Sequence, residues 1–142
     1  MPLKGLPMLA AAAMLAGCDS APPAPGVHLV EKAPYQALYG PDGRLQRLVY
    51  DGNGDGRAEV VTLFAPTGKP LRAEIDTDGD GVVDRWEYFG PDGALVKVGL
   101  SRRRNGRPDE WDYPDAAGGL ARRELDEDGD GRVDREEAVT GR

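Results

Sequence analysis

The sequence predicts an all-β protein, an antiparallel up-and-down meander of 25-residue hairpin repeats. Three observations support this fold. Equivalent residues recur every 25 positions without gaps after about residue 34. Apolar and polar residues alternate between these recurrences, which is the pattern of half-buried strands. Segments rich in Pro, Gly and Asp separate the alternating runs, as turns and loops separate strands.

Composition limits the size of the folded part. The chain has 142 residues, of which 39% are hydrophobic and 30% charged, so we expect one small domain without a large core of its own. The formal net charge of −7 argues against nucleic-acid binding, because phosphate contacts need a basic surface.

The first 17 residues have the pattern of an export signal. They combine one positive charge, Lys4, with an apolar run that is shorter than the roughly 20 residues of a membrane-spanning helix. The run ends in Leu15-Ala16-Gly17-Cys18, which resembles the lipobox of bacterial lipoproteins. That resemblance implies cleavage before Cys18, acylation of Cys18, and a membrane-anchored protein on the periplasmic or surface face of the bacterial cell envelope.

Residues 18–34 are predicted to be a disordered tether that follows the lipidated cysteine. Pro and Ala dominate this segment, which suits a semi-rigid spacer. We interpret His28 as a solvated tether residue. Asp19 resembles the inner-membrane retention signal of enteric lipoproteins, and the choice between inner and outer membrane stays open.

Residues 35–142 form the predicted repeat domain, in which each unit reads as strand, acidic loop, strand and tight turn. We expect eight or nine short strands, the first at Tyr35–Tyr39 and a final strand or short helical end at Arg135–Val139. Tight turns are expected at the Pro-Gly segments, such as Gly40-Pro41-Asp42-Gly43. Period-two alternation places a set of apolar and aromatic residues on one face, with Arg85 and Glu87 on the other; the set is Val61, Leu63, Trp86, Tyr88, Trp111 and Tyr113.

The acidic segments that begin at Asp51, Asp76, Ser101 and Asp126 are called loops one to four. Loops two and four both follow the pattern D-x-D-x-D-G-x-x-D-x-x-E. They therefore resemble EF-hand-type and thrombospondin type-3-like calcium loops, over about twelve residues each. The resemblance implies calcium ligands at Asp76, Asp78, Asp80, the Val82 carbonyl, Asp84 and Glu87, and at Asp126, Asp128, Asp130, the Arg132 carbonyl, Asp134 and Glu137.

Coordination chemistry supports calcium over other metals. Calcium takes six to eight hard oxygen ligands, whereas magnesium prefers a tighter octahedron that retains waters. Soft metals are disfavoured because the repeat domain has no Cys and no His. The alternative to a calcium site is an acidic, Gly-rich hairpin loop that binds no ion.

Loops one and three depart from the motif. Loop one offers Asp51, Asn53, Asp55, the Arg57 carbonyl and Glu59, but has Thr62 at the twelfth position, so we expect weaker binding. Loop three begins Ser101-Arg102-Arg103-Arg104-Asn105 and should not bind the ion; its arginines are expected to supply positive charge to neighbouring carboxylates. The 25-residue period leaves too little room for the two helices of an EF-hand, so a strand must carry Glu87, which puts its role as a ligand in question.

These features favour a lipid-anchored envelope protein with calcium-binding repeat loops and a structural or adhesive role. The expected partners are the membrane, through Cys18, and an envelope protein or polysaccharide. A calcium-responsive partner-binding protein and a calcium-independent β-repeat adhesion module are the alternatives. An enzyme is not expected, because Ser101 is the only serine of a domain without His or Cys; a carboxylate-dependent hydrolase is the remaining enzymatic alternative.

Overall fold

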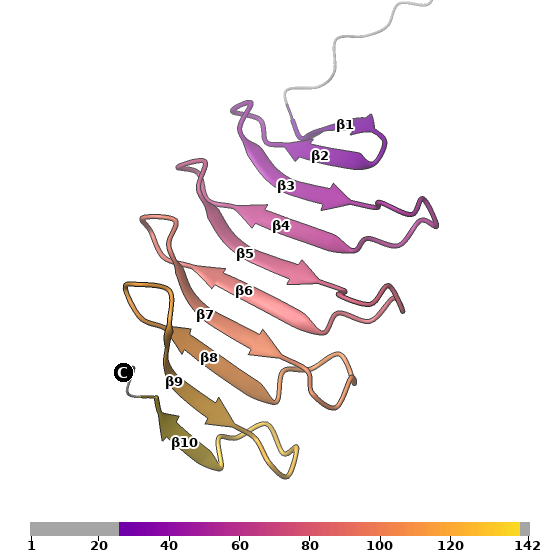
Figure 1. The fold of residues 1–142 in the computed structure, drawn as a ribbon. Helices are drawn as coiled ribbons and strands as arrows, with labels where there is room; N and C mark the ends of the chain where they lie inside the picture. Colours follow the sequence, from indigo (N-terminus) through magenta and orange to yellow (C-terminus); the bar gives the residue numbers. More distant parts are fainter. Residues whose placement is uncertain (1–25, 140–142) are drawn as a thin grey trace, which may run out of the picture.

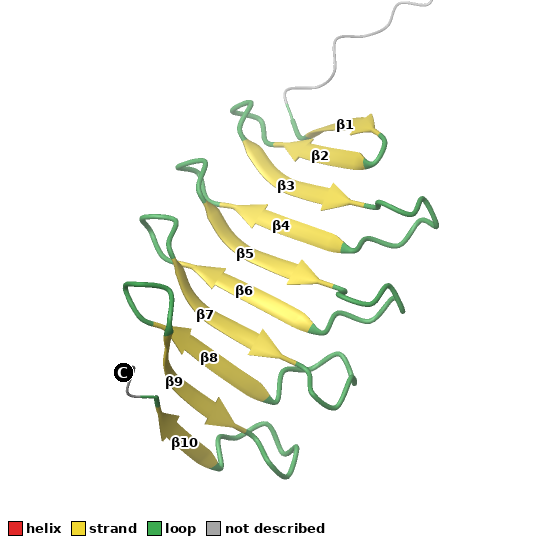
Figure 2. Cartoon of the chain, in the orientation of Figure 1, coloured by secondary structure: helices red, strands yellow, loops and turns green. Residues whose placement is uncertain are grey.

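The computed structural model describes residues 26–139, which form one open antiparallel sheet of ten strands (Figure 1). The strands follow one another in sequence order, and no helix occurs among the described residues (Figure 2). The prediction of an all-β meander is therefore confirmed. The strands are β1 (His28–Lys32), β2 (Tyr35–Tyr39), β3 (Leu45–Tyr50), β4 (Val60–Phe64), β5 (Pro70–Ile75), β6 (Arg85–Phe89), β7 (Leu95–Leu100), β8 (Glu110–Pro114), β9 (Leu120–Leu125) and β10 (Arg135–Ala138).

The two kinds of connection lie on opposite sides of the sheet. Loops one to four project from one side, and the tight turns project from the other (Figure 1). In the first tight turn the Gly43 amide donates to the Gly40 carbonyl at 2.9 Å, and Gly43 has φ +73°. Only glycine adopts this left-handed conformation without a steric cost, which explains the recurrence of glycine at this position.

A β-bulge follows each tight turn. The register slips where β2, β4, β6 and β8 meet the next strand, so that one residue of that strand has no partner in the ladder. The unpaired residues are Gln46, Leu71, Val96 and Ala121. Leu71 is 49% exposed and Val96 is 47% exposed. Period-two alternation would place them on the same face as Ala73 and Val98, which are buried. Bulges break the period-two rule locally, and the sequence pattern does not reveal them.

The register confirms the predicted division of the two faces. Trp86 lies opposite Gly99, and Gly99 lies opposite Trp111, so both tryptophans share one face of the sheet. Arg85 and Glu87 alternate with Trp86 along β6 and therefore occupy the other face. We call the side with the tryptophans the aromatic face.

The core is thin because a single sheet has no second layer to cover it. Among residues 26–139 the buried hydrophobic side chains are Ala73, Trp86 and Val98, which are 5%, 7% and 7% exposed. No described side chain falls below 2% exposure. The fold consequently depends on its backbone ladder and on contacts between neighbouring repeats.

The sheet begins at His28, inside the segment predicted to be tether, and has ten strands rather than eight or nine. His28 therefore belongs to strand β1 and not to a tether, but its side chain is exposed, as predicted for a solvated residue, with the ring stacked on Tyr39 at 5.1 Å between centroids. At the other end, residues 135–138 form a strand and not a helix. The predicted signal peptide, Cys18 and the first part of the tether lie outside the described residues. No helix within the described part of the chain is long and apolar enough to cross a membrane.

Candidate metal centres

In loops one, two and four the first residue is an Asp whose carboxylate organises the backbone of the loop. Asp76 is 6% exposed, and its two oxygens accept hydrogen bonds from the Gly79 and Gly81 amides at 2.8 and 2.7 Å. Asp126 is equally buried and accepts the equivalent bonds from Gly129 and Gly131 at 2.6 and 2.9 Å. Loop one repeats this arrangement around Asp51. The shared Asp and Gly positions thus fold three loops in the same way.

The ninth residue of each loop closes it from the opposite end. Asp84 accepts hydrogen bonds from the Thr77 hydroxyl at 2.9 and 2.7 Å. Asp134 accepts the Glu127 amide at 2.7 Å, and Glu59 accepts the Gly52 amide at 2.6 Å. The predicted ligand positions one and nine therefore also hold the loop together.

Two groups of acidic side chains form in loops two and four, at the ends of the strands on one side of the sheet. Asp76, Asp78 and Asp84 each bring an oxygen within 4.8 Å of the others, and so do Asp126, Asp128 and Asp130. Carboxylate oxygens at this spacing can surround one hard cation. Loops two and four could each hold a metal ion on this geometry.

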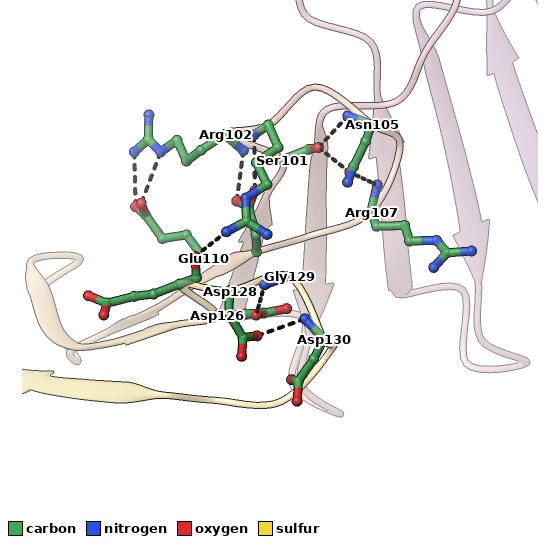
Figure 3. A network of polar contacts seen from close by, with 12 residues as sticks. Ser101, Arg102, Asn105, Arg107, Glu110, Asp126, Asp128, Gly129 and Asp130 are labelled. Atoms are coloured by element: carbon green, nitrogen blue, oxygen red, sulfur yellow. Dashed lines mark hydrogen bonds and ion pairs between the residues drawn. The ribbon is translucent and has the colours of Figure 1, made fainter.

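The Asp126 carboxylate is adapted to carry a negative charge. Burial acts to raise its pKa, but the Gly131 and Gly129 amides and the nearby Arg103 outweigh that effect and hold the pKa below its ordinary value. Figure 3 shows the Asp126 carboxylate facing Gly129, beside Asp128 and Asp130. An ionised carboxylate is the form that binds a metal.

Several predicted ligands lie outside these two groups. Asp80 pairs with Arg104 at 3.4 Å, and Asp134 bonds to the amides at the start of its own loop. Glu87 accepts from Arg85 at 2.7 Å, and Glu137 pairs with Arg135 at 3.0 Å. A residue on a strand faces its neighbours on the sheet, so the twelfth position is not brought into either group. The Val82 and Arg132 amides donate to Asp80 and Asp130, each at 2.8 Å.

Loop one forms no such group among the described residues. Asn53 replaces an acid here, and its side-chain oxygen accepts the Asp55 amide at 2.8 Å. Arg57 donates to the Asp80 carbonyl of loop two at 3.4 Å. Its guanidinium lies so close to Gly81 that a Cβ there would collide with it.

Loop three replaces the acids with groups that satisfy its backbone internally. The Ser101 hydroxyl, at the first position, accepts the Asn105 amide at 3.2 Å. Asp109, at the ninth position, accepts the Arg102 and Arg103 amides at 2.8 and 2.9 Å. The Arg104 amide also donates to the Ser101 carbonyl at 3.1 Å, so this loop closes without a cluster of acids and with a bonding pattern of its own.

The three arginines of loop three reach in different directions. Arg102 donates two parallel hydrogen bonds of 2.9 Å to Glu110 (Figure 3). Hydrogen bonding to Glu110 raises the pKa of Arg102. Arg103 donates to the Glu127 carbonyl of loop four. Arg104 pairs with Asp78 and Asp80 of loop two. Only Arg104 therefore reaches carboxylates of a neighbouring acidic loop.

A buried charge network on β8 and β9 was not anticipated from the sequence. Glu110, with a side chain only 6% exposed, contacts Arg102 and also Arg123 at 3.1 Å. Arg123 also forms two bonds to Asp112, at 2.6 and 2.8 Å, which raise its pKa. Two departures from the repeat could have revealed this network. Glu110 is an acid where the neighbouring repeats have Arg85 and Arg135, and Arg123 is a base where the preceding repeats have Ala73 and Val98.

Basic residues line the aromatic face at the 25-residue spacing. The Lys97 ammonium lies 5.6 to 5.7 Å from the ring centroids of Tyr88, Trp111 and Tyr113. Arg122 stacks on Tyr113 at 3.9 Å. These cation–π contacts link strands β6 to β9 on a face that no second layer covers.

No protein-family model and no curated protein matches the chain. Among solved structures, it is similar to a mutant of TarM from S. aureus in complex with fondaparinux, alpha-GlcNAc-glycerol and UDP, with 12% identity and a TM-score of 0.55 over 70% of this chain and 20% of that chain. A second TarM structure matches at 13% identity and a TM-score of 0.53, over 70% of this chain and 19% of that one. The chain thus spans about a fifth of the TarM length, and the likeness shows a shared sheet fold alone.

Proposed function

We propose that this protein is a lipid-anchored component of a bacterial cell envelope whose repeat sheet is stabilised by calcium bound in loops two and four. The observation that carries the proposal is that loops two and four each gather three carboxylates, at Asp76, Asp78 and Asp84 and at Asp126, Asp128 and Asp130. The first and third loop positions are shared by both groups, and the remaining member is the ninth residue in loop two and the fifth in loop four. Chance clustering of acids gives no reason for a group of three carboxylates in both loops that keep the complete acidic motif.

The proposed ligands come from the loops and not from the strands. Loop two offers Asp76, Asp78, Asp80, Asp84 and the Val82 carbonyl, and loop four offers Asp126, Asp128, Asp130, Asp134 and the Arg132 carbonyl. Water would complete a coordination number of six to eight. Glu87 and Glu137 are left out because arginines on their own strands engage them. Loop one is a weaker candidate, and loop three is not one.

Calcium would act on stability. The clustered carboxylates repel one another, and the thin core gives little reserve against that repulsion. An ion that binds only the folded chain stabilises it by mass action. With dissociation constants of about 10⁻⁴–10⁻³ M, typical of extracellular modules, 10 mM calcium would contribute roughly 1.4–2.7 kcal/mol per site.

Calorimetric titration of the purified chain tests the proposal, with Asp76→Asn and Asp126→Asn as variants. We expect two binding events in the wild type, the loss of one in each variant, and a rise in the melting temperature with calcium. Asp92→Asn is the matched control, because Asp92 lies in a tight turn on the far side of the sheet and bonds only to the Ala94 amide. Absence of heat and of any thermal shift at millimolar calcium would refute the proposal.

The membrane anchor is tested separately. Expression in a bacterium with a lipoprotein-processing pathway should yield a chain that begins at Cys18 and carries fatty acyl mass, as intact-protein mass spectrometry would detect. The Cys18→Ser variant should remain unacylated and leave the membrane fraction. An unmodified Cys18 in the wild type would contradict the anchor and leave the calcium proposal standing.

A binding role is the second candidate. Residues 26–139 form a single layer whose end strands, β1 and β10, each have one strand neighbour, and whose aromatic face is uncovered. Such edges and faces are the surfaces on which partners dock. A partner that binds only with calcium present would favour this role, whereas a change in stability alone would favour the structural one. No enzymatic activity is proposed.

A further inference from the structure

Arg104 stands where the other three loops have glycine. Positions 54, 79 and 129, each 25 residues from the next equivalent, are Gly with φ between +73° and +83°. Arg104 adopts φ +55° and is the only non-glycine residue with positive φ among residues 26–139. A residue with a side chain is strained in this left-handed conformation, so the surrounding structure must hold it there.

The strained backbone coincides with a contact to the neighbouring acidic loop. The Arg104 guanidinium pairs with Asp78 and lies 3.4 Å from the Asp80 carboxylate. Loops two and three are two strands apart, about 9–10 Å, which a long arginine side chain can cross. Asp78 and Asp80 are the third and fifth residues of loop two, two of the proposed calcium ligands.

No ion pair to the carboxylates of the proposed loop-four ligands occurs in the described part of the chain. Arg103 reaches loop four, but it donates to the Glu127 carbonyl, which is not a proposed ligand. Within residues 26–139 no ion pair involves Asp128 or Asp130. Arg103 also lies near Asp126, but it forms no ion pair with it. The two loops therefore differ in whether a guanidinium pairs with the carboxylates of the proposed ligands, as Arg104 does in loop two.

We propose that Arg104 is an internal counter-cation that occupies loop two until calcium displaces it. The inference rests on the proposed calcium function and adds an order of binding to it. Loop four fills first, and loop two fills at a higher calcium concentration because the ion must break the Arg104 contacts. The chain would then respond to calcium over a wider range than two identical loops.

The test compares Arg104→Gly with the wild type by calorimetric titration. Glycine restores the residue of the other loops and relieves the strained backbone, so the variant should fold, as its circular dichroism spectrum would verify. In both backgrounds Asp126→Asn removes loop four, which isolates the affinity of loop two. Exposed ion pairs are worth about 0.2–1 kcal/mol, which corresponds to a factor of about 1.4 to 5 in affinity, and we expect a gain in calcium affinity of that size at loop two.

Arg107→Gln is the matched control. Arg107 belongs to the same loop, and its amide donates to the Asn105 side chain at 3.1 Å. No ion pair of Arg107 occurs in the described part of the chain. This variant removes the same charge from the same loop and should leave the affinity of loop two unchanged. An equal gain in both variants would indicate general charge repulsion and overturn the displacement proposal.

The outcomes separate the two proposals. Calcium binding to the wild type with the same loop-two affinity in Arg104→Gly would refute the role of Arg104 and leave the calcium function standing. Binding at loop two only in Arg104→Gly would support the displacement in its strongest form. Absence of binding in every variant would overturn both. Calcium should also shift the side-chain Nε NMR signal of Arg104 in the wild type.

Discussion

Replacement of Glu110 by Gln removes the central acceptor of the buried charge network. The Glu110 side chain is 6% exposed and accepts two hydrogen bonds of 2.9 Å from Arg102, with Arg123 at 3.1 Å. A glutamine can accept with one oxygen only, and it points an NH₂ group at a guanidinium. The substitution therefore leaves two positive charges short of a partner.

The size of the loss in the free energy of unfolding depends on how well each arginine can be hydrated after the substitution. Removing one member of a fully buried ion pair costs about 3–5 kcal/mol. The Arg102 side chain is 61% exposed and can be rehydrated, and Arg123 retains Asp112. Hydrogen bonds to charged groups contribute about 1.5–3 kcal/mol, so we expect a loss near 2 kcal/mol.

Urea unfolding in the presence of a calcium chelator measures this loss. The unfolding midpoint of Glu110→Gln should fall by about 1 M relative to the wild type, given m-values of about 1–3 kcal/mol/M. Glu136→Gln is the control, because Glu136 pairs with Arg122 at 3.5 Å on an exposed surface and should cost less than about 0.5 kcal/mol. Equal midpoints for the two variants would refute the reasoning.

Three further predictions concern the loops and the core. The pKa of Asp126 in the folded chain lies below its ordinary value of 3.8. The ionised carboxylate therefore contributes its full stabilisation above pH 3.8, and this contribution is lost as the pH falls through the folded-state pKa. In urea titrations between about pH 4 and pH 2, the calcium-free wild type should lose stability more steeply than Asp126→Asn. Gly131→Ala, at φ +89°, should lower the free energy of unfolding by about 1–2 kcal/mol, whereas Gly119→Ala, at a glycine without positive φ, should cost less in the same assay. Trp86→Ala should cost about 3 kcal/mol, the low end for a core tryptophan because only one sheet covers it, and thermal unfolding that matches the wild type would contradict its place in the core.

The sequence was sufficient to predict most of the fold. Strand alternation is a local property, and the exact 25-residue recurrence of turn glycines fixed where each strand begins and ends to within a few residues. The acidic loops were predicted for the same reason, since Asp76 and Asp126 fold their loops through bonds to amides within five residues. The strand β1 was missed because it does not follow the repeat: the segment 25 residues further along the chain lies in loop one and is not a strand.

Tertiary structure decided which side chains meet across the repeats. Asp80, the fifth residue of loop two, and Asp134, the ninth residue of loop four, are both predicted ligands, yet neither joins the acidic group of its own loop. The side-chain directions at the bulges and the pairing of Glu87 with Arg85 likewise depend on the geometry of the sheet.

The sequence by itself determined the repeat, the meander and the positions of the acids, because these follow from short-range periodicity and turn chemistry. The tertiary structure decided that Arg104 contacts loop two, that Arg103 contacts loop four and that Glu110 is buried between two arginines. The physical reason is that the pairing of strands in one sheet places loops that are 25 residues apart side by side. One long arginine side chain can then span the distance between them and contact the neighbouring loop.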